Sequence, residues 1–109
     1  MKKHPLVKRT WTKEYSSGVQ LRCAFEKRGP IISRYTVQLE IKIDENWVPV
    51  IRYDNTHGFD HCDTMLPNGT QLKVPVVAAN ANEAFTRATT LLNASWMEHE
   101  DRFRKQVRQ

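Results

Sequence analysis

The residues best suited to chemistry lie in one segment, from Arg52 to Asp63, which reads Arg-Tyr-Asp-Asn-Thr-His-Gly-Phe-Asp-His-Cys-Asp. An arginine can hold a phosphate through its guanidinium fork, and a pair of histidines can donate and accept protons near neutral pH. We therefore predict acid–base chemistry on RNA or another phosphate-bearing substrate. The predicted catalytic residues are Arg52, His57 and His61, and the predicted substrate-binding residues are Asp54 and Asp63.

A metal site is the second interpretation of this segment. His57, His61 and Asp63 supply the side chains of a site with two histidines and one carboxylate. Gly58 and the turn-forming residues around it disfavour a helix, which would place both imidazoles on one face. We therefore expect no metal and no cofactor, and keep this set as the alternative.

A third interpretation is purely structural. Asp54 and Asn55 are typical of turns in which the side chain bonds the backbone, and Gly58 tolerates a positive φ. A surface loop between two strands is often built in this way, with Arg52 paired to an aspartate.

The elements that must position the segment are mostly strands. Alternation of apolar and polar residues predicts strands at residues 19–26 and 35–43. Apolar, β-branched and aromatic residues between turn signals predict further strands at 10–15, 47–54 and 71–77. Residues 60–66 are expected to form a hairpin with the last of these. Alternation also places Arg52 and Asp54 on the same face as Val48 and Val50, while Pro49 requires an edge or a bulge.

A long helix is predicted from Ala81 to about Lys105, with Asn80 as its cap. The fold class is therefore α+β: an antiparallel sheet of four or five strands packed against one long C-terminal helix. The helix is longer than the strands, so its end is expected either to expose Trp96 or Phe103 for a partner or to pack both rings into the domain's own core. The alternative function is a non-enzymatic interaction module that forms a homodimer or binds a protein partner there.

The net charge of +5 does not by itself indicate nucleic-acid binding. Between Thr10 and Met97 nine basic and nine acidic residues cancel, so most of the excess lies at the N-terminus. The 109 residues predict a single domain, 1–109, with a flexible basic arm at 1–9. No apolar run is long enough for a membrane span, and a cytoplasmic location is expected.

The segment resembles a family of small bacterial proteins, the TumE-type toxins of toxin–antitoxin pairs, over residues 35–65. The matching residues are Arg52, Asp54, Asn55, His57 and His61. The resemblance implies a toxin-like protein that acts on RNA; a neighbouring family with the same strand and turn is the alternative. The closing run of histidines in that family is replaced here by Asp60-His61-Cys62-Asp63.

Overall fold

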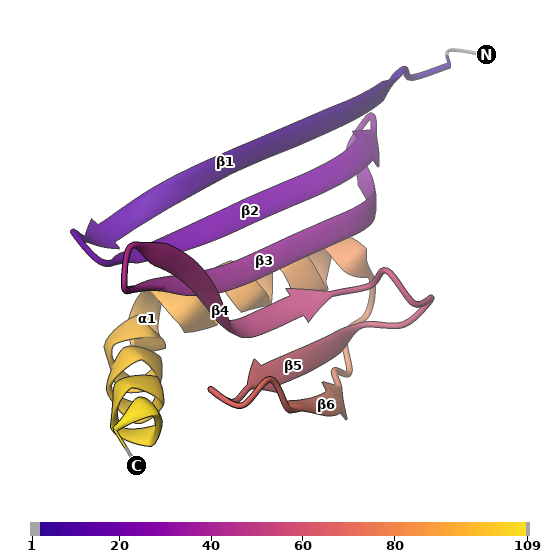
Figure 1. The fold of residues 1–109 in the computed structure, drawn as a ribbon. Coiled ribbons are helices and arrows are strands. Elements are labelled where there is room, and N and C mark those ends of the chain that lie inside the picture. The colour runs from indigo at the N-terminus through magenta and orange to yellow at the C-terminus, as the bar shows by residue number, and fades with distance from the viewer. Residues whose placement is uncertain (1–2, 109) are drawn as a thin grey trace.

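The computed structural model, which describes residues 3–108, contains one antiparallel sheet and one helix (Figure 1). The strands are adjacent in sequence order and joined by short turns. They are β1 (Leu6–Ser16), β2 (Val19–Arg28), β3 (Ile31–Ile43), β4 (Asn46–Asp54), β5 (His61–Met65) and β6 (Gln71–Pro75), and the helix is α1 (Ala81–Val107). The α+β class is confirmed, but the sheet has six strands in the described residues, where four or five were predicted.

The core lies between α1 and one face of the sheet. The alternating residues Tyr35, Val37, Leu39 and Ile41 of β3 are buried there, because every second side chain of a strand points to the same side. Other buried members of this core are Val19, Leu21, Cys23, Val50, Ile51, Ala84, Ala88, Leu92 and Phe103. We call the opposite side of the sheet, which includes Thr36, Gln38 and Glu40 of β3, the uncovered face.

A bulge in β4 changes which residues share a face. Leu39 pairs with Ile51, but the next residue, Glu40, pairs with Pro49, so Val50 is an extra residue between them. The prediction that Pro49 needs an edge or a bulge is confirmed. The predicted grouping of Val48 with Arg52 and Asp54 is wrong, because Val48 pairs with Ile41 on the core side.

The N-terminal arm is shorter than predicted. Residues 6–9 belong to β1, where Leu6 pairs with Arg28 and Lys8 pairs with Glu26. Residues 1 and 2 lie outside the described part of the chain. The basic residues Lys8 and Arg9 are therefore part of the folded sheet, because backbone pairing with β2 extends across them.

The helix begins where it was predicted, and its end packs against the protein itself. Asn80 Oδ1 accepts a hydrogen bond from Glu83 N at 2.9 Å, which caps the first turn. Phe103 is only 2% exposed, and Trp96 stacks on Tyr15 with 5.1 Å between ring centroids. Of the two predicted arrangements, packing against the domain itself is the one observed for Phe103, and Trp96 is partly buried against Tyr15.

Apolar side chains are exposed elsewhere, at the edge strand β6 and after it. Leu72, Val74 and Val77 are more than half exposed, because α1 packs mainly on β3 and β4. Among the described residues, no helix is both long and apolar enough to cross a bilayer.

Candidate functional site

The turn between β4 and β5 is tied firmly to β3. Asn55 Oδ1 accepts from Tyr35 N at 3.1 Å, and Asn55 Nδ2 donates to Ser33 O at 3.0 Å. Tyr35 Oη donates to Asp60 Oδ1 at 2.7 Å, and Gly58 turns the chain with φ +87°. These bonds use Asn55 and Asp60 structurally and fix the ends of β4 and β5 against each other.

Three ionisable side chains meet at these strand ends. Asp54 pairs directly with His61 across β4 and β5, and Asp63 follows two positions later on the same face. His61 Nε2 lies 2.8 Å from Asp54 Oδ1 and 3.3 Å from Asp63 Oδ2. The exposed fractions are 3% for Asp54, 0% for His61 and 2% for Asp63. We call this set the buried triad.

The orientation of the His61 ring determines which of its nitrogens faces the two carboxylates. His61 Nδ1 lies 3.1 Å from the carbonyl oxygen of Phe59. A carbonyl oxygen only accepts hydrogen bonds, so Nδ1 carries the proton and Nε2 faces the two carboxylates. Despite these short distances, neither contact has the direction of a hydrogen bond, and among the described residues Nε2 has no hydrogen-bond partner.

Asp54 and Asp63 have different second partners. Asp54 Oδ1 accepts from Thr56 N at 3.3 Å and from Thr56 Oγ1 at 3.2 Å, as the turn interpretation predicted. Lys73 Nζ of β6 forms an ion pair with Asp63 Oδ1 at 3.3 Å. This pair also lacks hydrogen-bond direction, which leaves Asp63 Oδ1 as a second buried atom without a hydrogen-bond partner.

Arg52 lies opposite Asp63 across β4 and β5, but its hydrogen bond belongs to another network on the uncovered face. Arg52 Nε donates to Gln38 Oε1 at 2.8 Å, and Gln38 Nε2 donates to Glu40 Oε2 at 2.6 Å. Gln20 and Arg22 of β2 also donate to the Glu40 carboxylate, which is 6% exposed. Burial alone would raise the pKa of Glu40, but these hydrogen bonds hold it below its ordinary value of 4.5.

The predicted catalytic residues do not form one solvent-facing group. His57 lies exposed in the turn, with its ring centroid 5.6 Å from that of the fully buried His61. The Arg52 guanidinium donates a hydrogen bond to Gln38. The alternative metal set is also changed, because Asp54 takes the place beside His61 and Asp63 that His57 was expected to fill.

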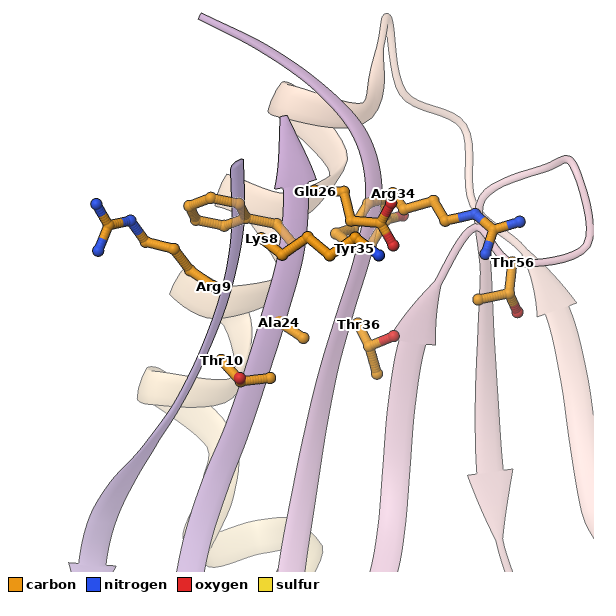
Figure 2. Close-up of a pocket in the computed structure, with 10 residues that line it drawn as sticks. Lys8, Arg9, Thr10, Ala24, Glu26, Arg34, Tyr35, Thr36 and Thr56 are labelled. Atoms are coloured by element: carbon orange, nitrogen blue, oxygen red, sulfur yellow. The ribbon is translucent and has the colours of Figure 1, made fainter. Parts of the chain in front are cut away.

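A groove of about 320 Å³ lies on the uncovered face beside these residues (Figure 2). Its floor is a cross-strand row of small side chains, in which Thr10 pairs with Ala24 and Ala24 pairs with Thr36. The next pairs in the same row are Thr36 with Asp54 and Asp54 with His61, so the floor leads to the buried triad. The groove exists because short side chains lie in a row between longer ones.

Charged side chains flank this floor. Lys8, Glu26 and Arg34 form the row on one side, and Figure 2 shows Arg34 extending toward Thr56 while Arg9 points away. Arg22, Gln38 and Arg52 form the row on the other side. The hydroxyl-bearing floor therefore has basic side chains along both margins.

Several residues of the candidate site were not predicted from the sequence. Glu40 looked like an ordinary polar member of an alternating strand, and Lys73 and Arg34 had no chemical neighbours in the sequence. The available signal was strand pairing: once register is known, Arg34 lies opposite Glu26, and Lys73 opposite Asp63. Lys8 was assigned to a flexible arm because its pairing with Glu26 depends on the position of β2.

The fold and the site define an α+β domain with a polar sheet face and a buried carboxylate–histidine cluster. The sequence model of a family described as a domain of unknown function (DUF7718) matches residues 2–109, so the chain belongs to that family. Comparison with curated proteins and with solved structures gave no significant match.

Proposed function

We propose that the protein binds a phosphate-bearing polymer, specifically single-stranded RNA, along the groove of the uncovered face. The observation that supports this proposal is the pairing of Lys8 with Glu26 and of Glu26 with Arg34 at the groove margin. This pairing brings part of the N-terminal charge excess onto the folded sheet. Clustered charge on a folded surface is what phosphate binding requires, and a flexible tail does not supply it.

The chemistry of the groove fits a sugar–phosphate backbone. Lysine and arginine neutralise phosphates, and threonine hydroxyls such as those of Thr10 and Thr36 donate hydrogen bonds to phosphate oxygens. In the margin formed by Lys8, Glu26 and Arg34, the one acidic residue stands between two cations, so this margin keeps a positive excess. Such contacts position a nucleic acid without reading its bases, so we expect little sequence preference.

The burial of His61 favours binding over cleavage at this surface. A general acid or base must lie within hydrogen-bond reach of the substrate proton that it transfers. His61 is fully buried and its Nδ1 is taken by the Phe59 carbonyl, so it has no contact with the groove solvent. Of the predicted site, Arg52 lies in the row next to the Thr36–Asp54 pair, outside the lining of the groove.

The test is an anisotropy titration of a fluorescent single-stranded RNA with the full chain at low salt. Arg34→Ala and Lys8→Ala are expected to weaken binding several-fold each, because each removes a cation from one groove margin. Lys105→Ala is the matched control, since Lys105 is an exposed cation on α1, paired with Asp101 at 2.9 Å. Equal weakening by the groove variants and the control would contradict the proposal, as would a wild-type protein that does not bind.

A further inference from the structure

We propose that Asp54, His61 and Asp63 bind a divalent first-row transition metal ion, with Mn²⁺ and Zn²⁺ as the ions to test. This inference goes beyond RNA binding and does not depend on it. Each residue offers one ligand atom, and these three atoms lie within 4.8 Å of one another. One imidazole nitrogen with two carboxylate oxygens suits ions of this class.

The two distances from His61 Nε2 to the carboxylates match those between neighbouring ligands of one ion. Metal bonds of about 2.0–2.2 Å place adjacent ligand atoms about 2.8–3.5 Å apart in octahedral and tetrahedral sites. His61 Nε2 is 2.8 Å from Asp54 Oδ1 and 3.3 Å from Asp63 Oδ2. The side chains therefore already converge as one half of a coordination shell.

The second observation is the buried nitrogen itself. His61 is 0% exposed, and among the described residues its Nε2 has no hydrogen-bond partner, although two carboxylates lie beside it. With Nδ1 protonated against the Phe59 carbonyl, Nε2 is left to present its lone pair toward the carboxylates. Two carboxylates and a lone pair around one point attract a cation, which satisfies all three groups.

The surroundings of the triad orient its side chains as supporting groups do in metal sites. Metal-bound histidines usually donate their other ring N–H to a carbonyl or carboxylate, and His61 donates to Phe59 O. Thr56 holds the Asp54 carboxylate through two hydrogen bonds. Both supports come from the turn between β4 and β5, which β3 anchors.

The competing arrangement is a buried ion cluster in which His61 carries a second proton and donates it to Asp54. That arrangement requires a directed N–H···O bond, and the geometry of the His61–Asp54 contact does not provide one. Lys73 distinguishes the two cases, because its ammonium group lies 3.3 Å from Asp63 Oδ1. In a metal site Lys73 competes with the ion for this carboxylate, whereas in an ion cluster it only adds stability.

The experiment uses untagged full-length protein that has been treated with a chelator, exchanged into metal-free buffer and titrated calorimetrically with Mn²⁺ and Zn²⁺. We expect one ion per chain and a rise in thermal unfolding temperature on binding. Asp63→Asn is expected to weaken binding at least tenfold, because it removes a charged ligand. Asp101→Asn is the matched control, since it also removes one carboxylate and Asp101 is an exposed residue of α1 outside the triad.

Lys73→Ala keeps the test decisive if Asp63→Asn folds poorly. Lys73 lies on the edge strand with its side chain 41% exposed, so we expect the variant to fold. A metal site predicts that Lys73→Ala binds the ion several-fold more tightly than the wild type. The proposal is overturned if neither ion binds at one per chain, if Asp63→Asn and Asp101→Asn bind equally, or if Lys73→Ala binds no more tightly than the wild type.

Discussion

His61 and Asp54 face each other across β4 and β5, with His61 Nε2 2.8 Å from Asp54 Oδ1 in an environment closed to solvent. The turn anchored by Asn55 brings them together, and alternation along β5 adds Asp63 on the same face. The buried triad therefore joins the ends of two strands. Its side chains therefore affect the stability of the protein as well as the binding of any ligand.

Replacing His61 should destabilise the metal-free protein far more than replacing His57. His61→Ala removes a fully buried ring and leaves two carboxylates beside each other, so we expect the free energy of unfolding to fall by about 3 kcal/mol. His57→Ala alters an exposed ring in the turn and should change stability little. Urea denaturation of both variants in chelator checks this, and similar losses would count against the burial of His61.

Glu40 should make the stability of the protein depend on acid pH. Hydrogen bonds hold its folded pKa below the ordinary value of 4.5, so the stabilisation is present above that pH. It is lost as the pH falls through the folded pKa. We expect Glu40→Gln to be less stable than the wild type at neutral pH and the difference to shrink under acid. Denaturant titrations over this range test it, with exposed Glu45→Gln as control.

The three tyrosines should ionise at higher pH in the folded protein than in the unfolded chain. Burial raises the pKa of Tyr53 to about 12 and also raises those of Tyr15 and Tyr35 above 10. Because the folded values exceed the unfolded ones, this stabilisation is complete below pH 10 and is lost as the pH rises through the folded values. Tyrosinate absorbance should rise near pH 10 in urea and at higher pH in buffer. Superimposable curves would contradict the burial.

The salt dependence of RNA binding should report the number of groove cations in contact with phosphate. For single strands, the logarithm of the binding constant falls with the logarithm of salt concentration with a slope of about 0.7 per neutralised phosphate. Arg34→Ala should therefore reduce the slope by about this amount, and Lys105→Ala should leave it unchanged. Anisotropy titrations at several salt concentrations measure both slopes. An unchanged slope for Arg34→Ala would show that Arg34 does not contact a phosphate of the bound RNA.

The order of strands and helix was predictable because its signals are local. Tyr35, Val37, Leu39 and Ile41 alternate in the sequence as they do in the core, and Asn80 caps the helix that was predicted at Ala81. The hairpin of β5 with β6 also follows from the turn residues between them. Counting strands was less reliable, because the short strand β5 lies within the polar segment and lacks an apolar alternation.

The sequence by itself showed that residues 52–63 concentrate arginine, aspartate and histidine at the end of a strand. Only the tertiary structure decided which of them meet. Register pairs Asp54 with His61, the turn leaves His57 in solvent, and the bulge at Val50 sets the face of Arg52. Side-chain type is a property of each residue, whereas burial and convergence depend on pairing between strands. For that reason the sequence showed where chemistry could occur, and the fold selected the residues that share a site.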